Sequence, residues 1–261
     1  MKSGSEGSFY LPAGSSDRFE PTPATAGPWS STAQHGGPPS GLLTRAVEAL
    51  LEPDRVIGRI SIDLLGPVPL GPLSVSTSVV RPGRAVSLLT ASLHDETAGR
   101  ECATARAWVL PRSGAGPAAP APLPHGPADG RLLPYVDTWG RGYIDAVEWR
   151  FVKGGDGGPA TVWMRSLVPL LPGEPLVGVP LLMTLVDSAS GASAVLDPAE
   201  WSFLNTDLTV NVLREPVGEW LCLDAETTLT STAVGLTTST VYDERGIVAR
   251  SAQTLLVLPR S

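Results

Sequence analysis

An aspartate at the end of an apolar segment is the residue whose position most suggests chemistry. Asp187 follows Val177 to Val186, a segment apolar on every face of a helix, and such a helix is buried. A buried carboxylate is costly unless it is paired or hydrogen-bonded, and it suits a general base that takes a proton from water. The alternative is a solvent-exposed aspartate where the helix turns polar, beside Ser188 and Ser190. We favour the catalytic interpretation.

A glutamine interrupts the last apolar run, Ile247 to Leu258. Gln253 could point inward as a hydrogen-bonding group of a site. An outward-facing polar residue of an alternating strand fits the pattern equally well. The residue pattern leaves both interpretations open.

Two glycines and a histidine precede a helical segment in the first part of the chain. Glycines before a helix N-terminus leave backbone N–H groups free to polarise a carbonyl or to hold phosphate. His35, Gly36 and Gly37 are therefore candidate substrate-binding residues. The alternative is that the two glycines only form a loop and that the histidine has a structural role.

Several other kinds of site are not indicated by the sequence. There is no Gly-x-Ser-x-Gly for a nucleophile elbow, and no Walker or Gly-x-Gly-x-x-Gly motif at a strand–helix junction. No Cys/His cluster has metal-ligand spacing. We therefore expect a site that uses neither a metal nor a cofactor.

Short strands and two helices must position these residues. Ser40 is the expected N-cap of a first helix over 40–52, with Leu42, Leu43 and Val47 on its apolar face. A second helix is expected over about 177–195. Alternation of apolar and polar residues predicts strands at 9–11, 60–64, 75–79, 85–93, 102–110, 143–151, 161–168, 207–213, 219–229, 234–243 and 247–257.

Composition agrees with many strands and turns. Glycine (28) and proline (26) make about a fifth of the 261 residues, which disfavours helical bundles, whereas 42% hydrophobic residues exclude a wholly disordered chain. The net charge of −7 and the scattered arginines argue against nucleic acid as a partner. Without a signal peptide or a membrane-spanning run, and with only Cys102 and Cys222, we expect a cytoplasmic protein.

The chain divides into two similar parts. An Ala/Pro/Gly-rich linker over 113–130 separates residues 8–112 from 131–261, after a flexible start over 1–7. Both parts end in Val-Leu-Pro-Arg, at 109–112 and 257–260, an offset of 148 residues. At that offset Gln253 falls on Ala105. We interpret this as a duplicated fold with one site, because the polar residue of one copy is apolar in the other.

A set of short motifs resembles the TesB-like branch of the acyl-CoA thioesterases. They are Gly27-Pro-Trp, Ala33-Gln-His-Gly-Gly-Pro-Pro39, Asn205-Thr-Asp-Leu-Thr209, Gly218-Glu-Trp220 and Arg250-Ser-Ala-Gln253. The resemblance implies an α+β double hotdog, with two antiparallel sheets that each wrap around one long helix. It also implies hydrolysis of an acyl thioester by an activated water.

The resemblance also implies the site residues. The family's Asp, Ser/Thr and Gln fall on Asp187, Asn205 and Gln253. Asn205 has no hydroxyl, although its amide can still donate and accept hydrogen bonds. This departure motivates the alternative of an acyl-CoA-binding module without activity. The absence of histidine after residue 130 disfavours hotdog hydratases.

Two further points stay open. A plain β-sandwich binding protein is a third hypothesis, and a low helix content would favour it. The expected partner is an acyl-CoA or another acyl thioester, and association of the chain with itself is left open.

Overall fold

The computed structural model describes residues 7–28, 30, 32–113, 124–132 and 141–260. Residues 1–6 of the expected flexible start and 114–123 of the expected linker lie outside the described residues. In the described part of that linker, the short 3₁₀ helix η2 (Pro127–Asp129) follows His125, whose carbonyl accepts a hydrogen bond from Trp163 Nε1.

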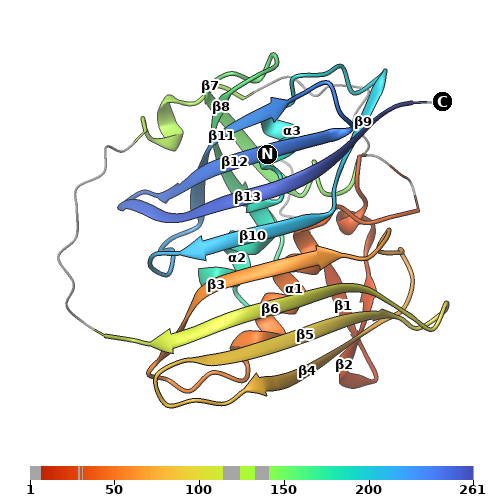
Figure 1. The fold of residues 1–261 in the computed structure, drawn as a ribbon, viewed down its shortest axis with the longest axis vertical. Coiled ribbons are helices and arrows are strands. Elements are labelled where there is room, and N and C mark those ends of the chain that lie inside the picture. The colour runs from red at the N-terminus through yellow and green to blue at the C-terminus, as the bar shows by residue number, and fades with distance from the viewer. Residues whose placement is uncertain (1–6, 29, 31, 114–123, 133–140, 261) are drawn as a thin grey trace.

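Thirteen antiparallel strands form a single sheet among the described residues, which Figure 1 shows face on. All eleven expected strands are present. Two strands were not predicted, β2 with its polar sequence and the short β9. The strands are β1 (Tyr10–Ala13), β2 (Ser15–Pro21), β3 (Arg55–Leu64), β4 (Leu73–Arg81), β5 (Ser87–Asp95), β6 (Arg100–Pro111), β7 (Val147–Lys153), β8 (Ala160–Ser166), β9 (Trp201–Asn205), β10 (Asp207–Val212), β11 (Trp220–Leu229), β12 (Val234–Asp243) and β13 (Gly246–Pro259).

From one edge to the other, the sheet runs β1-β2-β4-β5-β6-β3-β10-β13-β12-β11-β8-β7, with β9 paired to β13. The two halves meet at β3 and β10, and outward from there each half has its strands in the same order. The two sheets of the predicted double hotdog are therefore joined edge to edge into one continuous sheet. Antiparallel pairing of β3 with β10, centred on Ser61 and Thr209, joins the halves into one sheet and removes an exposed edge from each.

Strand pairing supports the duplication and corrects its register. Ser61 and Thr209 are 148 residues apart, but their partners Arg106 and Ala252 are 146 apart. The cause is the hairpin before the last strand, which closes at Asp95–Arg100 in one half and two residues tighter, at Asp243–Gly246, in the other.

This shift changes which residues are equivalent. The counterpart of Gln253 is Ala107 rather than Ala105, and Asn205 corresponds to the buried Ile57, since Ile57 pairs with Val109 as Asn205 pairs with Leu255. The two Val-Leu-Pro-Arg segments are out of structural register by two residues. The halves are nevertheless chemically unequal, because two apolar residues stand where the second half has two amides.

Both expected helices exist, but their bounds differ from the prediction. The first, α1 (Gly37–Glu48), begins before Ser40, and Gly36 is its N-cap. The physical reason is that Pro38 and Pro39 fit the first helical turn, where the missing N–H groups have no intrahelical partner anyway.

The second helix is interrupted. It ends as α2 (Gly178–Val186) with Asp187 as its C-cap, and the short α3 (Ala189–Ala192) follows. The sequence after Asp187 is rich in serine and glycine, which are weaker helix formers than alanine or leucine. The predicted long helix over 177–195 is therefore wrong, and the break leaves Asp187 at a helix end.

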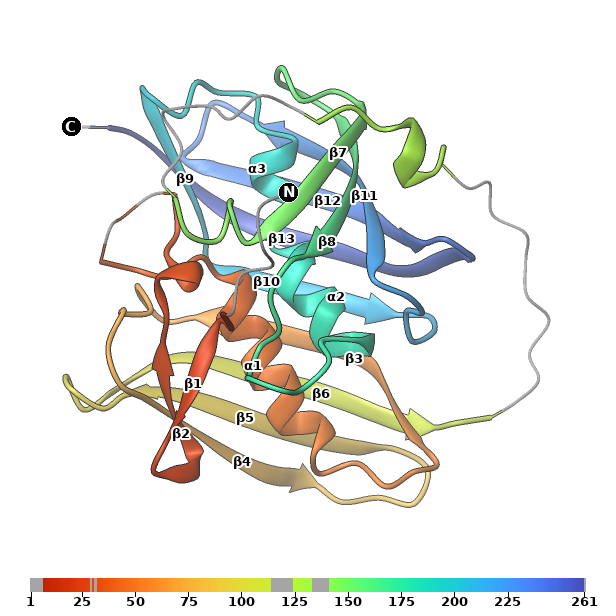
Figure 2. The same cartoon turned by 180° about the vertical axis from the view of Figure 1, so that it is seen from behind.

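The helices α1 and α2 lie side by side against one face of the curved sheet (Figure 2). Their close approach requires glycine. A Cβ on Gly41 would come within 2.1 Å of Thr184 Oγ1, and one on Gly37 within 2.2 Å of the Thr184 carbonyl oxygen. With two helices packed on the sheet, the β-sandwich hypothesis is wrong. Among the described residues, no helix is long and apolar enough to cross a membrane.

Candidate active site

The packing of α1 against α2 brings the N-terminus of one helix to the C-terminus of the other. A Cβ built on Gly36 would lie 2.9 Å from Asp187 Oδ2 and 3.0 Å from Oδ1, so the carboxylate rests directly against the N-cap of α1. Backbone N–H groups at a helix N-terminus favour a negative charge. Gly36 and Asp187, which are 151 residues apart in the chain, thus lie in direct contact.

The Asp187 carboxylate is buried and surrounded by hydrogen-bonding groups. Asn205 Nδ2 donates to Oδ1 at 2.6 Å. Gln253 Nε2 contacts the same oxygen at 3.3 Å and donates to the Asp187 backbone carbonyl at 3.1 Å. The side chain of Asp187 is only 4% exposed, and Gln253 is fully buried. The outward-facing interpretation of Gln253 and the solvent-exposed one of Asp187 are therefore wrong.

One acceptor in this cluster lacks a partner among the described residues. Gln253 Oε1 is buried and receives no hydrogen bond. A buried acceptor left unpaired costs about 1–3 kcal/mol, so a water molecule is its natural partner.

His35 lies on the other side of the carboxylate. Its Nδ1 is 3.0 Å from Asp187 Oδ2 and also 3.0 Å from the Gly37 amide nitrogen. Nδ1 cannot donate to the carboxylate and accept from Gly37 at once, because it carries either a proton or a lone pair. When the proton is on Nδ1, the Gly37 N–H is therefore released from the imidazole.

The position of His35 is fixed by groups from both halves. Its backbone N–H donates to the Thr25 carbonyl, and its ring stacks on Tyr143 with centroids 3.8 Å apart and planes 10° apart. The Tyr143 hydroxyl in turn donates to the Thr184 carbonyl at 2.8 Å and lies 2.9 Å from Ser188 Oγ.

Burial decides the charge of both rings. Burial lowers the pKa of His35, and the smaller opposing effect of the nearby Asp187 does not reverse it, so the imidazole is neutral at pH 7. Burial also raises the pKa of Tyr143, which therefore keeps its proton. Tyr143 orients His35 but is not suited to proton transfer.

A cavity of about 490 Å³ opens onto this cluster. His35, Gly36, Asp187 and Asn205 line it, as do apolar side chains from both halves of the chain. The apolar lining consists of Pro28, Ala33, Leu64, Pro67, Val68, Pro69, Ile144, Trp149, Leu204 and Leu256. Gly37 and Gln253 lie behind this surface rather than on it. Among the residues that the structure describes, no group of three or more His, Cys, Asp or Glu side chains could share a metal ion.

All six predicted site residues thus come together in one place. Tyr143 was not predicted, because its role depends on a contact with a histidine more than a hundred residues earlier and nothing in the local sequence indicates that contact. Gln34 was not predicted either. Its Oε1 accepts a hydrogen bond from the Tyr10 hydroxyl at 2.7 Å, and its Nε2 donates to the Pro69 carbonyl. Gln34 anchors the loop that carries His35.

Two family models match the chain. The acyl-CoA thioesterase N-terminal domain covers residues 25–110, and the acyl-CoA thioesterase C-terminal domain covers 117–257. The chain belongs to the acyl-CoA thioesterase family. The predicted family and the predicted class of enzyme, a thioester hydrolase, are both confirmed. No curated protein matches the sequence.

Solved structures confirm the hotdog fold of this thioesterase. A protein of unknown function with a hot dog fold from Alicyclobacillus acidocaldarius is 17% identical, with a TM-score of 0.72 over 95% of each chain. The acyl-CoA thioesterase II TesB2 from Mycobacterium marinum is 16% identical, with a TM-score of 0.69 over 88% of this chain and 91% of that one. The tesB protein of Mycobacterium avium subspecies paratuberculosis is also 16% identical, with a TM-score of 0.66 over 93% and 94%.

Proposed function

We propose that this chain hydrolyses the thioester of an acyl-CoA with a water molecule activated by Asp187. The observation that supports this most is the convergence of an N-terminal helix end, a neutral histidine and two amides on one buried carboxylate at the floor of an open cavity. A carboxylate held in this way is oriented before substrate arrives, which is what a general base requires.

The two amides would position the attacking water. Asn205 Nδ2 and Gln253 Nε2 both contact Oδ1, so the two amides would hold the carboxylate in place beside a water molecule in the cavity. Asn205 therefore fulfils through its amide a task for which the resemblance implies a hydroxyl. Its contact with the base argues against an inactive binding module.

The N-terminus of α1 would stabilise the negative charge that develops on the thioester oxygen. Pro38 and Pro39 have no N–H and Gly37 lies behind the cavity surface, so the Gly36 amide is the donor that this helix end presents to the cavity. His35 connects the two functions. When its Nδ1 carries the proton, the imidazole donates to Asp187 at the helix N-terminus and no longer accepts from the Gly37 N–H.

The proposed reaction conserves protons without an added group. Water attacks the carbonyl carbon while Asp187 takes its proton, and the C–S bond then breaks. The proton passes from Asp187 to the departing thiolate, whose conjugate thiol has a pKa of about 8.5. The products are a carboxylic acid and free CoA, and we propose that no cofactor takes part.

Thiol release from a panel of acyl-CoAs, before and after treatment with EDTA, tests this proposal. We expect release from at least one acyl-CoA, unchanged by the chelator. Tight binding of acyl-CoA without turnover of any member of the panel would contradict the proposal and support a binding module.

A further inference from the structure

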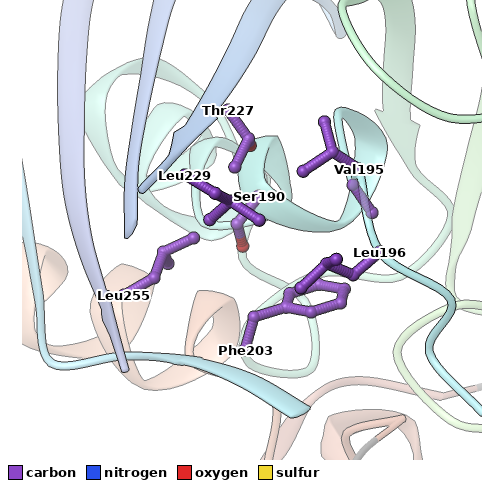
Figure 3. Close-up of a pocket in the computed structure, with 8 residues that line it drawn as sticks. Ser190, Val195, Leu196, Phe203, Thr227, Leu229 and Leu255 are labelled. Atoms are coloured by element: carbon purple, nitrogen blue, oxygen red, sulfur yellow. The ribbon is translucent and has the colours of Figure 1, made fainter. Parts of the chain in front are cut away.

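The two faces of the sheet differ in what covers them. Side chains of the inner face pack against the helices and leave little space behind α3, where Leu229 and Leu255 reach from the strands into a pocket of about 10 Å³ (Figure 3). That volume is close to the least that can hold one water molecule. The helices leave the outer face, which Figure 1 turns to the viewer, uncovered. The outer face is therefore the side of the sheet that is open to a partner.

Three arginines lie together at the centre of the outer face. Arg59 on β3 and Arg250 on β13 are the two cross-strand partners of Asn211, on the strand β10 between them. Arg106 on β6 pairs with Ser61, which points to the same face of β3 as Arg59 two residues before it. The three arginines, which we call the arginine cluster, thus come from three of four neighbouring strands.

The arginine cluster is not neutralised within the chain. Arg106 and Arg250 are exposed, and no arginine of the cluster forms a hydrogen bond or an ion pair with another described residue. The Nε atom of the half-buried Arg59 is shielded from solvent without an acceptor. A group of unpaired arginines in a chain with a formal net charge of −7 favours a partner that brings carboxylates to this face.

Two aspartates lie beside the arginine cluster on the same face. Asp63 and Asp207 are direct cross-strand partners on β3 and β10, each four residues along its strand from Arg59 or Asn211. Four residues of a strand span about 13 Å. Like charges directly opposite each other destabilise a sheet. The outer face therefore carries a positive group and, beside it, a negative group, and each of them favours a partner of the opposite charge.

We propose that a second copy of this chain packs face to face on the outer face, with the direction of its strands reversed. A twofold axis across the strands then brings the arginine cluster of each copy over the aspartate pair of the other, so that the surface complements itself. The row between the two charge groups consists of Ser61, Thr209 and Ala252, whose small side chains let two sheets approach to the usual distance of about 10 Å. A polyanion such as a nucleic acid is the alternative partner, but the two aspartates would repel it.

Sedimentation velocity at increasing protein concentration tests the inference. We expect the wild type to reach twice the monomer mass of 27.2 kDa at low salt, and to dissociate as salt screens the ion pairs. Arg106→Glu combined with Arg250→Glu should raise the dissociation constant about tenfold or more, as should Asp63→Arg, because each variant brings like charges together. An equimolar mixture of the two variants should regain the dimer, because the introduced glutamates then meet arginines.

Arg131→Glu combined with Lys153→Glu is the matched control. Both residues are exposed at the β7 edge of the sheet, and the pair changes the net charge as much as the double arginine variant does. The control should associate like the wild type. Circular dichroism should show the wild-type spectrum for each variant, because the substituted side chains do not belong to the buried core.

Two results would overturn the inference. One is a dimer that the double arginine variant retains, since another surface would then hold it. The other is a wild type that stays monomeric, and its binding to heparin would assign the outer face to a polyanion instead. Should Asp63→Arg fail to fold, the double arginine variant and its control still decide the question. None of these measurements depends on turnover of a thioester, so the inference fails or holds separately from the proposed function.

Discussion

Replacement of Gly36 by alanine should displace the Asp187 carboxylate without a direct effect on helix α1. Gly36 has φ −66° and ψ −17°, which alanine adopts without strain. The new Cβ would lie 2.9 Å and 3.0 Å from the two Asp187 carboxylate oxygens, whereas ordinary contacts begin at about 3.4 Å. The carboxylate must therefore retreat by about half an ångström.

This displacement predicts the size of the effect. A misplacement of 1 Å costs about 100-fold, so we expect kcat/KM to fall about 10-fold to 100-fold. Stability should hardly change, because alanine at a compatible position gains about 0.4–1 kcal/mol through the unfolded state, which offsets the tighter contact. Thiol-release kinetics and thermal unfolding followed by circular dichroism measure the two quantities separately.

The control for this prediction is Gly126→Ala. Gly126 has a φ of −68°, and no atom lies within 4 Å of its added Cβ, so both activity and stability should stay at wild-type values. Full activity of Gly36→Ala, or loss of its fold, would refute the argument that this glycine makes room for the carboxylate.

Three further substitutions test the packing and the charges. Gly37→Ala should destabilise the protein by about 1–3 kcal/mol or prevent folding, because its Cβ meets the Thr184 carbonyl at 2.2 Å; urea unfolding measures this. Burial, reinforced by a neighbouring carboxylate, raises the pKa of the half-buried Glu48 from 4.5 to about 7, so its ionisation costs stability progressively from pH 4.5 and fully above pH 7. Glu48→Gln should therefore stabilise the protein by about 1–2 kcal/mol at pH 8, allowing for solvent screening, and by nothing at pH 4. Burial opposes ionisation of Asp243, but Arg214 and backbone N–H groups lower its pKa. The ionised carboxylate therefore stabilises the fold above about pH 4, and this stabilisation is lost at lower pH. Asp243→Asn should lower the free energy of unfolding by about 2–3 kcal/mol at pH 7, and by less at pH 3.

The strands could be predicted because their residues alternate between a buried and an exposed face. Their register could not, because it depends on hairpin length. The turn after Asp243 is two residues tighter than the one after Asp95, and this moved the counterpart of Gln253 from Ala105 to Ala107. The pairing of β3 with β10 also could not be predicted from either strand alone, because each could have been an unpaired edge strand.

The candidate site was partly predictable for a different reason. Asp187 follows an apolar helical segment, so its burial could be predicted, whereas the pattern around Gln253 fitted an inward and an outward side chain equally well. The contact of Asp187 with His35 could not be predicted, because it arises only when α1 and α2 pack side by side. Tyr143, which stacks on His35, belongs to the same class of contact between the halves.

The central claim is that Asp187 activates the water that hydrolyses the thioester. Thiol release by Asp187→Asn tests it most directly, because asparagine keeps the size of the side chain but cannot take up the proton. With an unchanged unfolding transition, we predict that kcat falls by about 10²-fold to 10⁴-fold on the best acyl-CoA substrate. A folded Asp187→Asn variant with wild-type kcat would contradict the account.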